Sequence, residues 1–245
     1  MRRIIFFIYG VIVYVFTLLT ILYSIGFVGN VFVPKKIDAG TEASLGYALL
    51  VNTILLSLFA IQHSVMARQG FKKWWTRIVP EPVERSTYVL FASLLFVLLF
   101  HQWRPISGVV WNIENPIGSS ILSGLFWIGW LIAVISTFLI NHFDLFGLRQ
   151  VYLYLQGREY SPLEFKTPTF YKHVRHPNYL GFIIAFWATP YMTIGHFIFA
   201  IATTGYILVG ILLEEKDLIN QFGEVYKAYK TKVPMLLPGL RKWPS

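Results

Sequence analysis

The chain of 245 residues contains no cysteine and few charged residues. Without cysteine, disulfides, thiolate metal ligands and a cysteine nucleophile are all excluded. Asp, Glu, Lys and Arg together make up only 13% of the residues, whereas 56% are hydrophobic and 18% are aromatic. A water-soluble domain of this length would not stay dispersed with such a balance. The composition therefore predicts an integral membrane protein.

Long uncharged runs predict an all-α membrane protein with about six transmembrane helices. The last two predicted helices form a tight hairpin with Pro190 and Gly195 at its tip, because neither residue favours a straight helix. Five crossings are the alternative, with residues 179–213 forming one long kinked helix. No repeat or linker divides residues 1–245, which are expected to form a single membrane domain. The predicted helices are 4–28, 45–66, 86–103, 119–142, 179–194 and 197–213.

The segment from Asn178 to Leu213 has no Asp, Glu, Lys or Arg, and it is bracketed by Arg175-His176-Pro177 and by Glu214-Glu215. Two adjacent carboxylates at the C-terminal end of a helix oppose the helix dipole and are costly near lipid. A cationic ligand or partner would remove that cost. The bracket therefore predicts a binding site, although salt bridges between the Glu pair and nearby Arg and Lys residues are an alternative.

The distribution of basic residues predicts the orientation. Of the 21 Lys and Arg residues, all but Lys35, Lys36 and Arg104 fall in the N-terminus, the 67–85 loop, the 143–177 segment and the tail. By the positive-inside rule these parts are cytoplasmic, so both termini are cytoplasmic and the number of crossings is even. The formal net charge of +9 then reflects topology and attraction to anionic membrane lipid, and it does not indicate nucleic acid.

Five groups of polar residues at the helix ends fall on the predicted cytoplasmic face, whereas His101 and His196 fall on the outer face. The five groups are 62–64, 84–88, 141–144, 176–179 and 214–215. This convergence predicts a cytosol-facing site sunk into the bundle. His63 and His142 could instead bond a neighbouring helix, and Arg149 and Arg175 could be simple anchors. Apolar residues at 218, 222, 225 and 229 predict a C-terminal cytosolic amphipathic helix, either a lid or a surface anchor.

Carboxylates, an arginine, a histidine and tyrosines at one cytosolic surface suit S-adenosylmethionine. Its ribose hydroxyls and ammonium suit carboxylates, its own carboxylate suits Arg or Lys, and its adenine and sulfonium suit aromatic faces. Other zwitterions would suit the same residues, so the spacing alone does not single out this cofactor.

A longer motif runs Arg175-His176-Pro177-x-Tyr179-x-Gly181, an apolar hairpin, Glu214-Glu215, and then Phe222-Gly223-x-x-Tyr226-x-x-Tyr229-x-x-x-Val233-Pro234. It resembles the C-terminal half of the membrane methyltransferases related to isoprenylcysteine carboxyl methyltransferase and phospholipid methyltransferases. Segments 62–68, 84–90, 142–150 and 186–190 resemble a bacterial subgroup of that family that methylates methanethiol. The resemblance covers roughly residues 55–240, and residues 1–45 carry none of it.

The resemblance implies transfer of the methyl group of S-adenosylmethionine to methanethiol in the bacterial inner membrane, with residues 141–240 as the cofactor-binding core. Other members of the family methylate prenyl-cysteine and phospholipid substrates, and some proteins of the fold are non-catalytic accessory proteins. A methyltransferase for one of those substrates and an accessory protein therefore stay open as alternatives. No metal is implied, and the oligomeric state is left open. The residues expected to contact the cofactor are Arg175, His176, Tyr179, Glu214, Glu215, Tyr226 and Tyr229, together with Lys232.

The small thiol substrate must lose a proton, and forming its thiolate at pH 7 costs at least ~2 kcal/mol. A histidine or aspartate within hydrogen-bond reach can accept that proton. His142 and Asp144 are the first candidates and His63 is the next, because they match the subgroup motifs and share one predicted face. The residues expected beside the thiol are Gln62, Tyr88, Asn141 and Arg149.

Overall fold

The structure is a computed structural model that describes residues 1–41 and 43–239. Leu240, the last residue of the predicted core, and the tail residues Arg241 and Lys242 lie outside the described residues. In chain order the elements are α1 (Arg2–Gly29), α2 (Leu45–Met66), α3 (Gln69–Trp75), α4 (Glu81–Gln102), β1 (Val109–Asn112), α5 (Pro116–Ile140), α6 (His142–Leu145), α7 (Leu148–Leu155), the 3-10 helix η1 (Thr169–Lys172), α8 (Pro177–Trp187), β2 (Tyr191–Thr193), α9 (Ile194–Phe222) and α10 (Glu224–Lys232).

Five of these helices, α1, α2, α4, α5 and α9, are long and apolar enough to cross a membrane. A helical membrane protein is therefore confirmed. The remaining predicted span is represented by α8, which has 11 residues. At 1.5 Å per residue it extends ~16 Å, about half of the ~30 Å hydrocarbon core.

The boundaries of the last two long apolar segments differ from the predicted ones. Where residues 179–194 were expected to be helical, α8 ends at Trp187 and a short strand follows. At the other end, α9 continues to Phe222, so Glu214 and Glu215 lie inside the helix and not at its end. Residues 214–222 contain neither Gly nor Pro, and the helix ends where Gly223 takes a φ of 57°.

The short sheet was not predicted, because its strands are brief and lie at the ends of apolar helices. Strand β1 pairs with β2, and the indole of Trp111 donates to the carbonyl oxygen of Thr189. The carbonyl oxygen of Pro190 accepts from the amide of Ile113. These bonds satisfy backbone groups in the non-helical segment between α8 and α9.

The contacts among the described residues divide the chain into two compact units. The first unit contains Met1–Gly108, Asn141–Pro162 and Thr193–His196. The second contains Val109–Ile140, Leu163–Met192 and Phe197–Ser245. The expectation of a single membrane domain stays a prediction.

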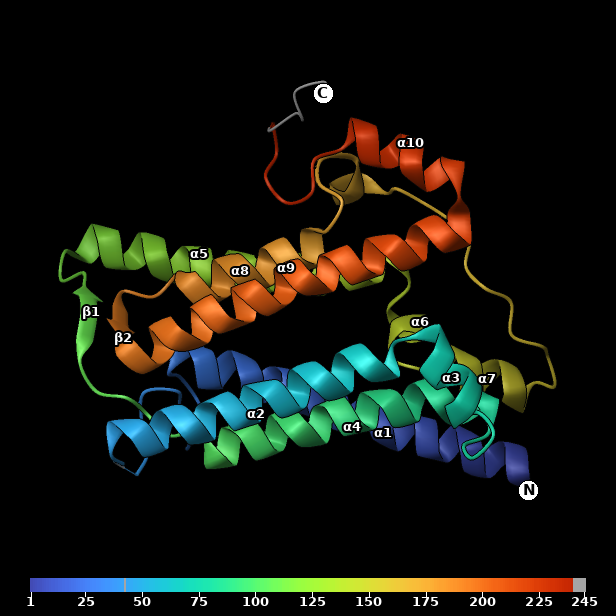
Figure 1. Ribbon diagram of the computed structural model, residues 1–245, viewed down its shortest axis with the longest axis horizontal. Helices are drawn as coiled ribbons and strands as arrows, with labels where there is room; N and C mark the ends of the chain where they lie inside the picture. Colours follow the sequence, from blue (N-terminus) through green and yellow to red (C-terminus); the bar gives the residue numbers. More distant parts are fainter. Residues whose placement is uncertain (42, 240–245) are drawn as a thin grey trace. The chain divides into compact units, whose positions relative to one another are not determined.

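In the first unit, α1 packs against α4 and α7, and α2 packs against α4 (Figure 1). The hydroxyl of Tyr9 bonds the Thr87 hydroxyl at 3.0 Å, tying α1 to α4. Gly147 joins α6 to α7 with a φ of 85°, and a Cβ there would lie 2.6 Å from the backbone nitrogen of Ser86. Glycine is therefore required where this turn meets α4.

In the second unit, small residues let α5 and α8 approach closely. A Cβ on Gly181 would lie 2.5 Å from the carbonyl oxygen of Gly129 and 2.6 Å from the amide nitrogen of Ala133. Small residues at such crossings are the usual means of packing membrane helices. The side chain of Asn178 also donates to the carbonyl oxygen of Ala133 at 2.8 Å, which fixes the first turn of α8 against α5.

Contacts between α8 and α9 show that the two helices run antiparallel. The Trp187 indole donates to Thr204 at 3.0 Å near the end of α8, whereas His176, at its start, lies 3.2 Å from Glu215. Later residues of α8 thus meet earlier residues of α9 (Figure 1). This arrangement carries the Glu pair back to the start of α8.

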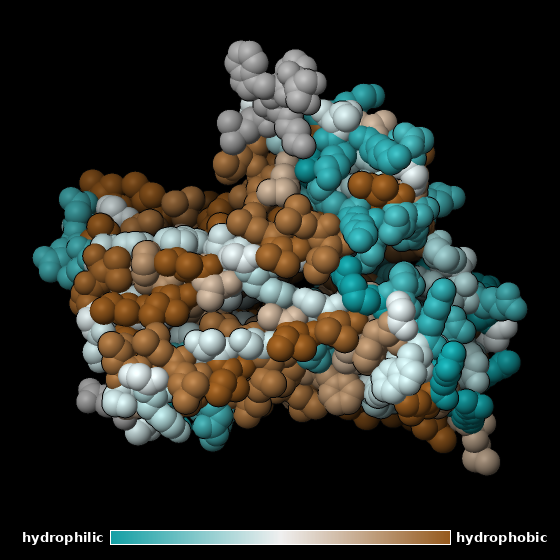
Figure 2. Space-filling model, viewed as in Figure 1, coloured by the Kyte–Doolittle hydropathy of each residue, from teal (hydrophilic) through white to brown (hydrophobic). Residues whose placement is uncertain are grey.

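Figure 2 shows hydrophobic side chains along the exposed sides of the long helices, while hydrophilic side chains gather over α10 and, in the first unit, over α3 and α7. The exposed hydrophobic residues include Leu58, Ile61, Leu208 and Leu212. Apolar surface along the whole middle of a helix is what lipid requires.

Candidate active site

In the second unit, a group of basic side chains surrounds Glu215. This Glu215 cluster consists of Arg175, His176, Glu215 and Lys230. Glu215 is only 2% exposed. Its Oε1 lies 2.6 Å from Nε of Arg175, and its Oε2 lies 2.6 Å from Nζ of Lys230. A carboxylate buried this deeply is stable only when it is paired, so Glu215 forms the salt bridges that the sequence left open as an alternative.

Arg175 also fastens the end of α10 to the start of α8. Its Nη1 donates to the carbonyl oxygens of Lys230 and Val233. The backbone amides of Arg175 and His176 donate to the carbonyl oxygens of Pro234 and Met235. Pro177 occupies the first helical position of α8, where its missing N–H costs nothing. Arg175 and His176 precede the helix, and their amides pair with the segment after α10.

Aromatic residues form one wall beside the cluster. The Phe165 ring lies 5.7 Å from the Tyr226 ring and 5.3 Å from the Tyr229 ring. The Tyr229 hydroxyl donates to the carbonyl oxygen of Tyr171. Burial raises the pKa of Tyr229 to about 12 and also raises the pKa of Tyr226. Both hydroxyls therefore keep their protons at neutral pH and can donate hydrogen bonds.

Two buried polar atoms near this cluster have no hydrogen-bond partner among the described residues. They are Oε2 of Glu214 and the hydroxyl oxygen of Tyr226. Oε2 of Glu214 lies 3.8 Å from Nδ1 of His176, which is too long for a hydrogen bond. Leaving a buried acceptor unsatisfied costs ~1–3 kcal/mol. A ligand that donates hydrogen bonds would recover that energy here.

The remaining predicted cofactor residues differ in how closely they approach the cluster. The Tyr179 ring lies 5.7 Å from the His176 ring, whereas Lys232 is exposed. Lys230 is the lysine that reaches Glu215, and it was not among the residues predicted from the sequence. The signal was present, because Lys230 follows Tyr226 by one turn on the same face of α10.

In the first unit, the short helix α6 positions His142 and Asp144. Asn141 precedes the helix, and its side-chain oxygen accepts from the Asp144 amide at 3.1 Å, a normal N-cap. His142 is buried, and its Nε2 lies 2.8 Å from the Tyr14 hydroxyl oxygen. Burial lowers the pKa of His142 from its usual value, so the imidazole is neutral at pH 7 and can accept a proton.

Asp144 is held by other side chains of the first unit. Its Oδ1 lies 2.8 Å from Nη1 of Arg149, and its Oδ2 accepts from the Tyr160 hydroxyl at 3.3 Å. Arg149 also donates to Ser161. Both carboxylate oxygens of Asp144 are thus already bound by other side chains. The geometry therefore favours His142 over Asp144 as a proton acceptor.

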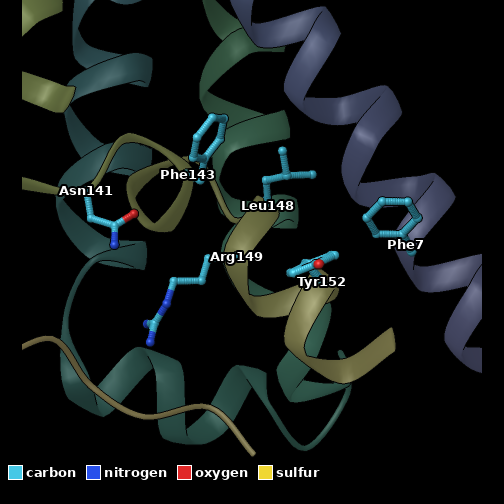
Figure 3. A pocket seen from close by; sticks show the side chains of 6 residues that line it. All are labelled: Phe7, Asn141, Phe143, Leu148, Arg149 and Tyr152. Atoms are coloured by element: carbon cyan, nitrogen blue, oxygen red, sulfur yellow. The ribbon is translucent and has the colours of Figure 1, made fainter. Parts of the chain in front are cut away.

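A pocket of about 430 Å³ adjoins this turn. Its walls are mostly apolar, with one amide and one guanidinium, and Figure 3 shows these side chains on α1, α7 and the turn that contains α6. Asn141 and Arg149, both predicted to lie near the thiol, line it. The other lining residues are Phe7, Phe143, Leu148 and Tyr152.

The structure brings together three more predicted residues of the first unit, Gln62, His63 and Tyr88. The Tyr88 hydroxyl lies 2.9 Å from Nδ1 of His63, and the Gln62 amide donates to the Tyr88 carbonyl oxygen at 3.4 Å. Phe59 stacks on the His63 ring at 5.1 Å. His63 is thus in contact with neighbouring helix residues, as the simpler interpretation of the sequence allowed.

These features define a helical integral membrane protein that carries polar side-chain clusters in both of its units. Methanethiol S-methyltransferase of Crocosphaera subtropica is 57% identical over 96% of the chain and 92% of its own length. Methanethiol S-methyltransferase of Mycobacterium tuberculosis is 52% identical over 100% of the chain and 98% of its own length. Nurim of Xenopus laevis is a more distant relative, 31% identical over 66% of the chain and 60% of its own length.

No protein family model matches the chain, and no solved structure matches it. The identities with curated relatives, which extend over nearly the whole chain, nevertheless decide its membership. The protein belongs to the methanethiol S-methyltransferase family.

Proposed function

We propose that this protein transfers a methyl group from S-adenosylmethionine to methanethiol and releases dimethyl sulfide and S-adenosylhomocysteine. The choice of acceptor is supported by the names of the relatives, which are 52–57% identical to this chain. The choice of donor is supported by the chemistry of the Glu215 cluster.

The observation that carries the donor site is the pair of unsatisfied buried atoms, Oε2 of Glu214 and the Tyr226 hydroxyl oxygen. The ammonium and ribose hydroxyls of the donor are hydrogen-bond donors that fit a carboxylate oxygen. Glu215 is already bound by Arg175, His176 and Lys230, so Glu214 is the carboxylate left for the ligand.

The other residues of the cluster set the electrostatic environment. Arg175 and Lys230 place positive charge where the donor's carboxylate would bind, and Glu215 holds both of them in position. The rings of Tyr179, Tyr226 and Tyr229 offer faces for the adenine and the sulfonium. When bound, S-adenosylmethionine supplies an electrophilic methyl group. Lys232 is exposed, and we place it at the edge of the donor site.

We assign the thiol to the first unit, where His142 accepts its proton. The imidazole is neutral at pH 7, and general-base assistance of this kind contributes roughly 10²–10⁴-fold to a rate. Asp144 and Arg149 form an ion pair that shapes the turn carrying His142. His63 is the second candidate for the base, with Gln62, Tyr88 and Asn141 as further polar neighbours of the thiol.

The proposed topology has both termini in the cytoplasm and six passes through a bacterial inner membrane. Helix α8 spans ~16 Å, and residues 188–193, if fully extended, add up to ~20 Å, which together exceed the ~30 Å core. Non-helical backbone at this depth must be covered by protein. Ala188 and Met192 are buried, and β2 pairs with β1, which supports a pass of this kind.

The test is to incubate the purified protein in lipid nanodiscs with S-adenosylmethionine and methanethiol, and to assay the headspace by gas chromatography. We expect dimethyl sulfide in proportion to the S-adenosylhomocysteine formed. Parallel samples contain a prenyl-cysteine or a phosphatidylethanolamine in place of methanethiol. Methylation of either lipid without volatile product would overturn the proposed acceptor. No binding of S-adenosylmethionine by calorimetry would favour a non-catalytic accessory protein.

A further inference from the structure

Tyr14 on α1 is joined directly to His142, although 128 positions separate the two residues in the sequence. The hydroxyl oxygen lies 2.8 Å from Nε2 of the imidazole. Both residues belong to the first unit. Tyr14 lies outside the motifs shared with the methyltransferases, so the sequence did not predict a role for it.

The surrounding packing holds this hydroxyl in place. The Tyr14 ring meets the His142 ring edge-on, at an interplanar angle of 89°. It also packs against Phe143 and Phe146. His142 is 5% exposed, so water competes little for the imidazole. A hydrogen bond in such surroundings is stronger than the same bond in water.

The protonation state of His142 decides what this hydrogen bond is worth. A neutral imidazole has one nitrogen that donates and one that accepts, whereas an imidazolium donates from both. A tyrosine hydroxyl can rotate to serve either state. Towards the imidazolium it accepts a charge-assisted bond, which is roughly twice as strong as a neutral one. Tyr14 therefore favours the protonated imidazole, opposing the effect of burial.

We propose that Tyr14 is a positioning residue for thiol deprotonation, orienting the His142 imidazole and accepting a hydrogen bond from the imidazolium. This inference rests on the proposed function, in which His142 takes the proton. As the S–H bond breaks, the proton moves to His142 and the sulfur keeps the electron pair. That pair forms the new bond to the methyl carbon while the donor's C–S⁺ bond breaks, its electrons passing to the donor sulfur. The proton then leaves to water.

Other ionisable groups lie on the elements packed around α6. Asp144 on α6 and Arg149 on α7 pair with one another. Arg85 on α4 donates to the carbonyl oxygen of Leu145. Tyr160, after α7, donates to Asp144. Because these groups remain in place when Tyr14 is changed, a pH profile of Tyr14 variants isolates the effect of its hydroxyl.

A purely structural role, in which Tyr14 only pins α1 to α6, predicts different behaviour, and the chain offers a matched control. Tyr9 lies on the same helix, and its hydroxyl bonds Thr87 at 3.0 Å. Tyr14→Phe and Tyr9→Phe each remove one hydroxyl and one hydrogen bond from α1 to a neighbouring element. For Tyr14→Phe we expect turnover at pH 7 to fall roughly five- to tenfold with little change in KM. The loss should shrink as pH rises towards the thiol's own pKa. Tyr9→Phe should match the wild type at every pH.

A second readout does not depend on turnover. In protein with isotope-labelled histidine, the His142 signal is assigned by its loss in His142→Gln and followed by NMR against pH. We expect Tyr14→Phe to lower its titration midpoint by roughly half to one pH unit. If Tyr14→Phe does not fold, 4-fluorophenylalanine at position 14 replaces the hydroxyl by a fluorine that is a very weak hydrogen-bond acceptor, and it should shift the midpoint in the same direction.

An unchanged His142 midpoint, or equal losses in Tyr14→Phe and Tyr9→Phe, would overturn the inference while leaving the proposed function intact. Failure of the wild-type protein to make dimethyl sulfide would instead overturn the proposed function. If His142→Gln keeps the wild-type rate and pH profile, His142 is not the base and Tyr14 has no role in deprotonation.

Discussion

Nε of Arg175 and Oε1 of Glu215 lie 2.6 Å apart in a buried ion pair that joins the residues just before α8 to the C-terminal half of α9. Both residues are more than nine-tenths buried. Lys230 adds a second cation from α10. The pair therefore ties three elements of the second unit together, and it gives Glu214 and Glu215 different expected roles.

Glu215→Gln should destabilise the protein, whereas Glu214→Gln should mainly weaken binding of the methyl donor. Removing one partner of a buried pair costs ~3–5 kcal/mol, because the opposite charge is left uncompensated. Glu214 is partly exposed and lies no closer than 3.8 Å to His176, so its loss should reduce donor affinity about tenfold with little change in Tm. Thermal melts and calorimetric titration with S-adenosylmethionine measure the two effects. Equal effects of both changes on Tm would contradict this division.

Lys230→Met should lower both Tm and donor affinity, because it leaves Oε2 of Glu215 without its nearest cation. Lys227→Met is the control. Lys227 lies on the same helix and forms an exposed pair with Glu224. Exposed pairs contribute only ~0–1 kcal/mol. We expect at least a threefold larger Kd for the donor with Lys230→Met and no change with Lys227→Met. Indistinguishable variants would show that the Glu215 cluster does not need Lys230.

His142→Gln and Asp144→Asn should differ in their response to pH. Burial lowers the pKa of His142, so the imidazole stays neutral to a lower pH than that of an ordinary histidine. Activity should therefore fall only when the pH drops below the usual ~6.5 of a histidine. His142→Gln should cut turnover about 10²-fold at pH 7 and recover with a slope near one as solution thiolate forms. Asp144→Asn breaks the ion pair with Arg149, and its smaller loss should persist at high pH. Steady-state pH profiles distinguish the two. Recovery of Asp144→Asn alone would make Asp144 the base.

Gly181→Ala should destabilise the second unit by forcing α5 and α8 apart. The added Cβ would meet the carbonyl oxygen of Gly129 at 2.5 Å, and backbone atoms cannot give way as a side chain can. Overpacking of this kind costs ~1–3 kcal/mol. Gly124 lies on α5, the partner helix, and a Cβ there meets nothing within 4 Å. Gly124→Ala should therefore be neutral or slightly stabilising. Thermal melts in nanodiscs measure both. A normal Tm for Gly181→Ala would show that the helices can separate freely.

The sequence by itself determined the membrane class, most of the long helices and the members of the polar groups. Hydropathy decides these, because a helix that meets lipid must be apolar along its length and polar residues are retained there only at a cost. The motif beginning at Arg175 also determined the family. The sequence did not determine the helix ends. Helix α9 runs past the Glu pair to Phe222, and the positive φ of Gly223 ends it.

Only the tertiary structure decided which polar atoms are already bound and which are left for a ligand. Periodicity marks Glu214 and Glu215 alike, yet Glu215 is 2% exposed and is bound by Arg175, His176 and Lys230, whereas Glu214 keeps a buried oxygen without a hydrogen bond. The same is true of Tyr14, whose contact with His142 joins residues far apart in the chain. Side-chain pairing depends on how helices pack, and a one-dimensional pattern records faces and spacings but not partners.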